Sequence, residues 1–179
     1  LIERLGADVT EPVLLALVRS LVTASREDLI PEFRGYAKAL ARFDGTGTKP
    51  IAATDLVGLS VNAAMNRVLE SSADIPTLFD ALVDASAQAM LRYDLAVGSH
   101  TDLSVSHNIH WLDFTHALTF ANAVRVLCTE TPSLWPAALL QLACFLGRNA
   151  SFLGVDESAR WQVVDAKSFV AQEQARLFD

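Results

Sequence analysis

The sequence is poor in basic residues and has no long hydrophobic run. Lys and Arg number 14 among 179 residues, against 21 Asp and Glu, and they are spread thinly along the chain. With a net charge of −7 and no basic stripe, the chain has little with which to neutralise nucleic-acid phosphates. The longest nearly apolar stretch, Leu134 to Leu146, is interrupted by Gln141 and falls short of the about 20 residues that a membrane helix needs. We therefore expect neither a nucleic-acid partner nor a membrane partner.

Cysteine is scarce as well. The two cysteines, Cys128 and Cys144, lie in apolar segments with helical spacing and do not form a C-x-x-C pair. This apolar context, without a C-x-x-C pair, favours free and buried thiols in a reducing compartment. The start of the chain shows no charged segment followed by an apolar one, as a secretory signal would. We predict a cytoplasmic protein.

Several catalytic motifs are absent. There is no H-E-x-x-H zinc motif and no G-x-S-x-G nucleophile elbow, so a serine hydrolase built from Ser106, His116 and Asp113 is a minor alternative. The Gly- and Thr-rich segment 44–50 lacks the Lys-Ser/Thr pair of a phosphate loop. We interpret it as an ordinary turn, within a loop near 44–52.

Apolar residues are abundant and recur at helical spacing. They make up 51% of the chain, the mean hydropathy is +0.29, and no stretch alternates apolar and polar residues as a strand does. We predict an all-α multi-helix bundle, either a single domain over 1–179 or the C-terminal half of a larger helical fold. Helices are expected from Pro12 onward and over 26–43, 55–71, 76–93, 111–129, 135–145 and 158–177.

Such a composition also predicts a large apolar surface. We expect it to be covered by an upstream half of the same polypeptide or by a second copy in a homo-oligomer. The chain begins with Leu1 and not with methionine, and this too is expected of a fragment.

All four histidines fall within one 17-residue window, at His100, His107, His110 and His116. Histidine changes charge nearest neutral pH and is a common ligand of transition metals, so the cluster indicates metal or proton chemistry. On one straight helix His107 and His110 lie about 60° apart, whereas His116 lies about 180° from His107. Either the helix begins near Asn108, or the histidines divide between different roles. Exposed polar filler is the alternative interpretation of the cluster.

His116 is the strongest candidate. Its neighbours at helical spacing, Leu112, Phe120 and Ala123, are apolar, while Asp113 and Thr119 lie one turn away. This pattern predicts an inward-facing imidazole whose second nitrogen is held by a polar partner. A core histidine with a satisfied hydrogen bond fits the same pattern.

One of the three lysines lies in an apolar helical segment near the C-terminus. Burial of Lys167 would favour a neutral amine, able to act as a base or, as a carbamate, to bind a metal. A snorkelling side chain is the alternative.

Three segments resemble the questin oxidase-like family. They are the H-A-x-T segment with its surroundings (Trp111 to Arg125), the Leu-Trp-Pro helix start (Leu134 to Gln141) and the segment around Lys167. Members are about twice this length, so the chain is similar to their C-terminal half. His116 matches the histidine of H-A-x-T, and Lys167 matches the lysine of an H-x-x-K-like segment whose histidine is Val164 here.

The resemblance implies a mainly helical oxygenase that opens a ring of anthraquinone-type aromatic polyketides. Combined with the histidine window, it predicts His116 and Asp113 as catalytic residues and His116, His110, His107 and Lys167 as metal ligands. Non-haem Fe(II) is the expected metal, because imidazoles with open coordination positions suit iron and dioxygen. The resemblance also suggests NADPH as the electron donor and an apolar aromatic small molecule as the substrate.

A non-catalytic function explains the composition equally well. In that interpretation the chain is a helical interaction module that packs an apolar face on a partner or on its missing N-terminal half. Trp111, Phe114 and Phe120 would then be core residues rather than the walls of an aromatic pocket.

Overall fold

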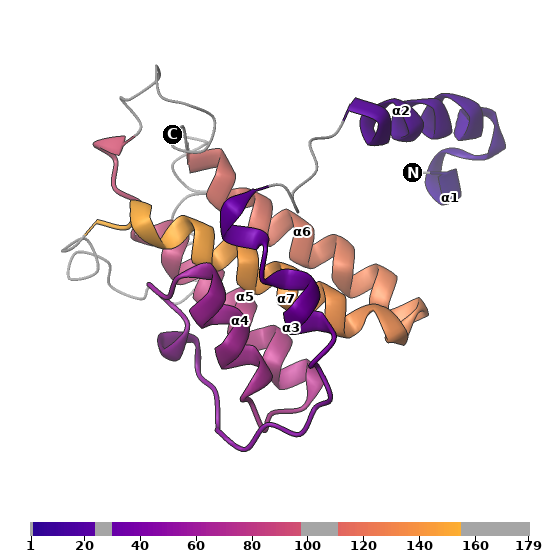
Figure 1. Cartoon of the computed structure of the whole chain (residues 1–179). Helices are drawn as coiled ribbons and strands as arrows, with labels where there is room; N and C mark the ends of the chain where they lie inside the picture. Colours follow the sequence, from indigo (N-terminus) through magenta and orange to yellow (C-terminus); the bar gives the residue numbers. More distant parts are fainter. Residues whose placement is uncertain (1, 24–29, 98–110, 155–179) are drawn as a thin grey trace, which may run out of the picture. The chain divides into compact units, whose positions relative to one another are not determined.

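The computed structural model describes residues 2–23, 30–97 and 111–154 (Figure 1). Helices, 3-10 turns included, make up 74% of these residues. The same ranges contain no strand, only the isolated β-bridges Lys49–Ser71 and Tyr93–Leu153. The predicted all-α class is confirmed. Within these ranges, no helix has both the length and the hydropathy that a membrane span requires.

The chain divides into two compact units, residues 1–34 and 35–179. The first contains α1 (Ile2–Leu5), the 3-10 turn η1 (Ala7–Val9), α2 (Thr10–Thr23) and the 3-10 turn η3 (Pro31–Phe33). Proline is tolerated in a first helical turn, where its missing N–H has no partner to lose, and Pro12 lies there in α2. α2 buries none of its residues, so the first unit forms no core of its own around this helix.

The helix predicted over 26–43 is wrong. Ile30 is extended (φ −68°, ψ 122°), as expected for a residue that precedes a proline, and Pro31 begins a separate 3-10 turn. In the second unit a short helix, α3 (Tyr36–Leu40), covers part of the remaining range. Residues 24–29 lie outside the described ranges.

The second unit is a bundle of α3 with four longer helices. These are α4 (Val61–Leu69), α5 (Ile75–Leu91), α6 (Trp111–Glu130) and α7 (Trp135–Asn149), joined in part by the 3-10 turns η4 (Ala53–Asp55), η6 (Pro132–Leu134) and η7 (Ala150–Phe152). The predicted helices over 76–93, 111–129 and 135–145 match α5, α6 and α7 closely. The predicted helix over 158–177 lies outside the described ranges.

α4 begins later than the predicted residue 55. Ala53–Asp55 forms its own turn, in which a carboxylate oxygen of Asp55 accepts a hydrogen bond from the Ala52 N–H. Gly58 then adopts φ +84°, a left-handed conformation that cannot continue a helix. The sequence 55–71 is apolar at helical spacing, yet these two local features delay the helix by about two turns.

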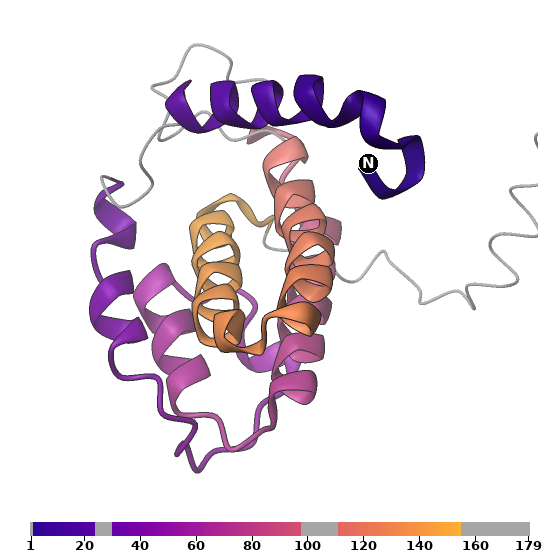
Figure 2. The same cartoon turned by 90° about the vertical axis from the view of Figure 1, so that its right-hand side faces the viewer.

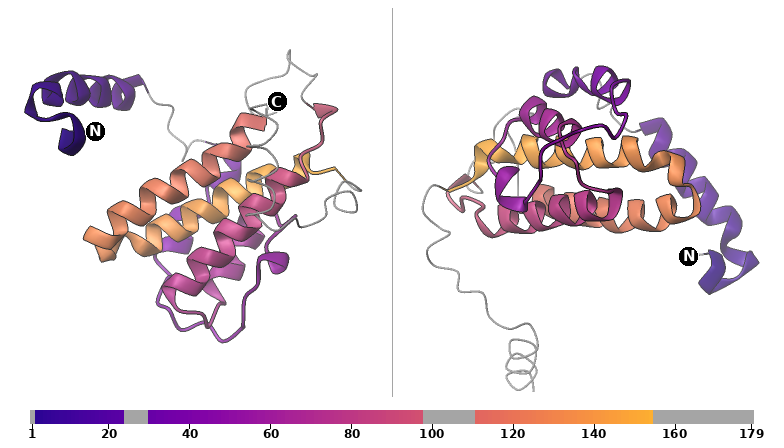
Figure 3. Two further views of the ribbon diagram at one scale, coloured as in Figure 1. Left: turned by 180° about the vertical axis from the view of Figure 1, so that it is seen from behind. Right: turned by 90° about the horizontal axis from the view of Figure 1, so that it is seen from below.

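α7 is the central helix of the bundle. It packs against α3, α4, α5 and α6, and Figure 2 shows it lying between α3 and α4 on one side and α5 and α6 on the other. A helix surrounded in this way must be apolar on nearly all sides. Its buried residues are Ala138, Leu139, Leu140, Leu142, Ala143, Cys144, Leu146, Gly147 and Asn149. α6 and α7 form a hairpin that is seen from two further directions in Figure 3.

Both cysteines are free and buried, which confirms the prediction. The Sγ atom of Cys144 lies 3.6 Å from Sδ of Met65, so it joins α7 to α4. Cys128 packs with Val124 and Ala138 beside the partly buried rings of Phe120 and Trp135. Burial raises the pKa of the Cys128 thiol, which makes it a poor nucleophile.

Candidate functional site

Two of the predicted site residues lie on α6, and the others fall outside the described ranges. His116 and Asp113 are in the first two turns of this helix. His107 and His110, together with His100, precede it in segment 98–110, and Lys167 follows in 155–179; neither segment is described. Of the predicted site residues that the structure describes, His116 and Asp113 lie close to one another.

The imidazole of His116 is on the outer side of α6. Its side chain is 62% exposed, which makes the predicted inward orientation wrong for the described part of the chain. The buried face of α6 is formed by Phe114, Ala117, Ala121, Val124 and Cys128. At about 100° per residue, His116 lies about 120° around the helix from the centre of that face. α5 and α7 cover the face that contains Phe114 and leave the His116 side open. The apolar residues around His116 therefore did not indicate burial.

Asp113 lies within ion-pair reach of His116. Nδ1 of the imidazole is 3.9 Å from Oδ1 of the carboxylate, an interaction of i and i+3 residues on one helix. This separation is longer than a hydrogen bond, so the carboxylate does not fix the tautomer of the ring. The hydroxyl of Thr119 donates to the His116 carbonyl oxygen at 3.1 Å, and so this hydrogen bond is to the main chain rather than to the ring.

His116 belongs to a mostly apolar surface of α6, which we call the outward stripe. Its members share one face at helical spacing and are all exposed: Leu112, His116, Thr119, Ala123, Val126 and Leu127. Leu112 is 62% exposed, and Val126 and Leu127 are 53% and 52% exposed. These large apolar side chains lie near the two ends of the stripe and are open to solvent at both.

The aromatic residues of α6 have different surroundings. Phe114 is 1% exposed and meets the ring of Tyr93 edge-on, with centroids 5.0 Å apart. Phe120 packs in the same manner on Phe145 at 5.3 Å. Phe114 is a core residue and Phe120 is a partly buried residue that packs on the core, whereas Trp111 is 49% exposed at the start of the helix. Burial, with Asp113 and Asp94 nearby, raises the pKa of the Tyr93 hydroxyl, so this residue stays neutral at physiological pH.

The described residues do not form a metal centre by themselves. Within residues 2–23, 30–97 and 111–154, no three His, Cys, Asp or Glu side chains are grouped closely enough to hold an ion. One histidine and one carboxylate are fewer ligands than a catalytic iron or zinc site uses. The predicted metal role of His116 stays a prediction that depends on ligands from other segments.

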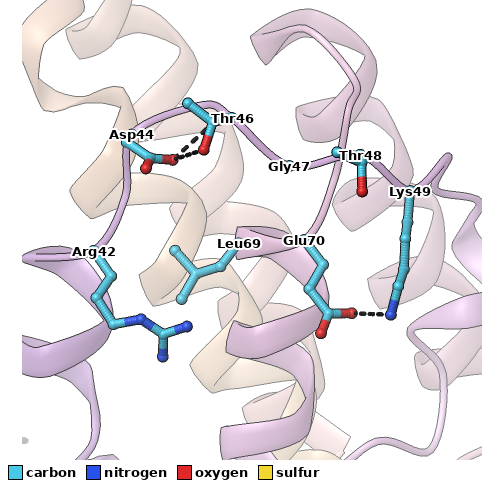
Figure 4. A pocket seen from close by; sticks show the side chains of 8 residues that line it. All are labelled: Arg42, Asp44, Thr46, Gly47, Thr48, Lys49, Leu69 and Glu70. Atoms are coloured by element: carbon cyan, nitrogen blue, oxygen red, sulfur yellow. Dashed lines mark hydrogen bonds and ion pairs between the residues drawn. The ribbon is translucent and has the colours of Figure 1, made fainter.

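A polar cavity lies beside the loop that follows α3 (Figure 4). It has a volume of about 520 Å³ and is lined by Arg42, Asp44, Thr46, Gly47, Thr48, Lys49, Leu69 and Glu70. The loop is held to the end of α4, because the Lys49 N–H donates to the Glu70 carbonyl and Nζ of Lys49 lies 2.8 Å from Oε2 of Glu70. Two cations and two anions line the cavity, so it presents no net charge.

A second cavity, of about 500 Å³, lies where the same loop meets α4, α5 and α7. We call it the apolar cavity; it is lined by Phe43, Asp44, Gly45, Val68, Leu69, Ser71, Ala73, Asp74, Ile75, Leu78 and Pro136. Sequence reasoning missed both cavities, because it interpreted segment 44–50 only as a turn. A concentration of Asp, Thr and Gly between two helices was the available signal, but it is equally typical of any loop.

The questin oxidase-like resemblance rests on three segments, two of which are described. Segment 111–125 lies on α6 and segment 134–141 covers the start of α7, so they are consecutive parts of one helical hairpin. No family model matches the chain, and the searches of curated proteins and of solved structures likewise found no match. The resemblance stays a prediction.

Proposed function

We propose that this chain provides one wall of an oxidation site for an apolar aromatic substrate, as its resemblance to the questin oxidase-like family implies. The observation that carries the proposal is the place of His116 within the outward stripe, with Asp113 one turn away. A titratable imidazole in an otherwise mostly apolar surface becomes a reactive group once that surface is covered and water is excluded.

Each residue of the wall has a role in this proposal. His116 accepts or delivers a proton, and Asp113 stabilises the imidazolium that forms. Leu112 and the half-exposed ring of Trp111 offer apolar contact to an aromatic substrate. The other proposed metal ligands are His107, His110 and Lys167. Fe(II) bound among these side chains would supply the activation of dioxygen. NADPH is the proposed electron donor, and the free, buried cysteines support a cytoplasmic location.

The test compares wild type with His116→Ala and Asp113→Asn at the protein's natural length. Metal content, oxygen consumption and consumption of a hydroxyanthraquinone are measured together. We expect His116→Ala to lower oxygen consumption by about 100-fold or more, the scale of a lost acid–base group. Asp113→Asn should cost about 10-fold, as for a partner that orients a histidine.

Asn122→Ala is the matched control, because Asn122 is an exposed residue of α6 that does not belong to the outward stripe. It should leave all three quantities unchanged. Oxygen consumption and metal content that stay at the wild-type level in both test variants would contradict the proposal.

A second function is favoured by the exposure of Leu112, Val126 and Leu127. We propose as the alternative that the chain is a non-catalytic helical module whose outward stripe packs on a second copy of itself. Solvent exposure of three large apolar side chains is unfavourable, and their burial at about 25 cal/mol per Å² would drive association. An oligomer without oxygen consumption would distinguish this function from the first.

A further inference from the structure

The apolar cavity has the size and lining of a small-molecule site. Its volume of about 500 Å³ lies within the range of about 300–1,000 Å³ that is typical of such sites. The wall is formed by apolar residues from four segments, and two of them, Val68 and Leu78, belong to the buried core. Core packing keeps side chains in fixed rotamers, so this wall is preformed.

Two carboxylates from different segments line this cavity. Asp74 caps the N-terminus of α5, where its Oδ1 accepts a hydrogen bond from the Thr77 N–H at 2.9 Å. Asp44 is held by an analogous local turn, because its Oδ1 accepts from both the N–H and the hydroxyl of Thr46, at 2.9 and 2.7 Å. Each carboxylate has about four lone-pair sites on its two oxygens, so both residues retain capacity to accept a hydrogen bond from a ligand.

The charge at this cavity favours a cation. The hydrogen bonds from Thr46 and Thr77 hold the pKa values of Asp44 and Asp74 below their ordinary range, so both are ionised at neutral pH. Within the described part of the chain neither carboxylate forms a salt bridge. Arg42 is a cation of the adjacent polar cavity, and its charge lowers the Asp44 pKa less than the hydrogen bonds from Thr46 do. The carbonyl end of α4 at Leu69 adds partial negative charge, while the N-terminus of α5 at Ile75 adds partial positive charge beside Asp74, so the two carboxylates decide the sign.

We propose that the apolar cavity binds a small primary amine with an aromatic body. The ring occupies the wall of Val68, Leu78 and Pro136, and the ammonium group donates to the carboxylates of Asp44 and Asp74. A carboxylate or phosphate ligand is disfavoured by repulsion from the same two residues. This site is distinct from the one proposed on α6, and its existence does not depend on that function.

The probe is phenethylamine, and its binding to the whole chain is measured by calorimetry and by NMR titration. The comparison ligands are 2-phenylethanol and 3-phenylpropanoate, which keep the ring and replace the ammonium group by a neutral or an anionic group. We expect the amine to bind at least about tenfold more tightly than the alcohol, since charge-assisted hydrogen bonds exceed neutral ones. The anion should bind most weakly.

The decisive variant is the double substitution Asp44→Asn with Asp74→Asn. Asparagine retains an oxygen that accepts the local hydrogen bonds and is as good a helix N-cap as aspartate, so the fold should be unaffected. We expect amine affinity to fall about tenfold or more while the alcohol is bound as before. Asp80→Asn with Asp84→Asn removes the same two charges at exposed residues of α5 outside the cavity; this double variant is the control and should retain wild-type affinity.

A third variant tests the place of binding. Ala73→Leu adds apolar volume at the cavity lining and should abolish binding of both the amine and the alcohol, with folding checked by circular dichroism. Amine affinity that is unchanged in the double Asn variant, or equal affinity for amine and alcohol, would overturn the assignment. Failure of phenethylamine to bind wild type at millimolar concentration would overturn it as well.

Discussion

At the scale of single residues, short hydrogen bonds to exposed carboxylates hold the loops of the second unit in place. Asp55 is the clearest case, because its Oδ2 accepts from the Ala52 N–H at 3.0 Å and from Nη2 of Arg67 at 2.8 Å. Arg67 also donates to the Pro50 carbonyl, so one guanidinium joins α4 to the segment before η4. These contacts explain why an exposed acidic residue contributes to the stability of the bundle.

The Asp55 contacts predict a specific pH dependence. The hydrogen bonds from Ala52 and Arg67 lower the pKa of Asp55 below 3.8, so the folded state favours the ionised form. This stabilisation is present above the unfolded-state pKa and is lost as pH falls through the lower folded-state pKa. Wild type should therefore lose more stability between pH 6 and pH 3 than Asp55→Asn does, as measured by urea unfolding at both values.

Asp80→Asn is the control for this measurement, since Asp80 is an exposed residue of α5. It should follow the wild-type pH profile. A loss of stability between the two pH values that is as large in Asp55→Asn as in wild type would show that Asp55 does not carry the effect.

At the scale of elements, the contact of α7 with α4 depends on one glycine. A Cβ atom on Gly147 would lie 2.4 Å from the Cα of Val61 and 2.8 Å from the carbonyl carbon of Ser60. These are backbone atoms at the start of α4, so they cannot rotate away as a side chain does. The helices approach this closely only because position 147 has no side chain.

Gly147→Ala should therefore destabilise the bundle although alanine is the better helix former. The propensity gain of about 1 kcal/mol is outweighed by a backbone displacement that costs about 1–3 kcal/mol beyond it. Thermal and urea unfolding measure the difference. Asn122→Ala on the exposed side of α6 gains helix propensity and loses the exposed 3.4 Å hydrogen bond from Nη2 of Arg125, and it should be neutral or stabilising. A Gly147→Ala protein as stable as wild type would mean that α4 and α7 are less closely packed than described.

Helix starts were predicted correctly where a proline or a capping residue marks them in the sequence. The Pro136 and Trp135 start of α7 and the Asp74 cap of α5 both lie at or near predicted helix starts. The prediction of a helix over 26–43 was wrong because Pro31 forces the preceding Ile30 into an extended conformation. The prediction had followed the apolar spacing and had given this local effect too little weight.

At the scale of the whole molecule, the outward stripe has the symmetry that a self-association surface requires. Leu112 and Leu127 lie at equal distances from one point of α6, between Thr119 and Phe120, and so do His116 and Ala123. In an antiparallel pair of α6 helices, Leu112 of one copy would meet Leu127 of the other at both ends. The small Ala123 would leave room for His116 between them. Such a contact closes on itself, as a two-fold dimer does.

On the second of the proposed functions, wild type dimerises in the micromolar range, as measured by analytical ultracentrifugation. Leu112→Lys and Leu127→Glu should each weaken the dimer, because each buries a charge without a partner. The double variant should restore it, since an antiparallel pair places Lys at 112 against Glu at 127. Leu95→Lys, at another exposed leucine, is the control. A wild-type monomer at every concentration, or a double variant weaker than both single ones, would contradict this arrangement.

The sequence by itself determined the helical class and the free thiols. Helical spacing of apolar residues needs only the period of the helix and the gain from burial, so α5, α6 and α7 could be located from it. The same reasoning identified Cys128 and Cys144 as buried, because cysteines in apolar helical segments behave as small hydrophobic residues.

Only the tertiary structure decided which apolar face each helix buries. Residues on both sides of α6 are hydrophobic, so its pattern could not tell Phe114, which is buried, from Leu112, which is exposed; the packing of α5 and α7 makes the choice and turns His116 outward. The cavities likewise arise between segments far apart in the chain; the apolar cavity, for example, is lined by Asp44, Asp74 and Pro136. The spacing of residues in the sequence does not predict which distant segments line a common cavity, because that depends on how whole helices pack.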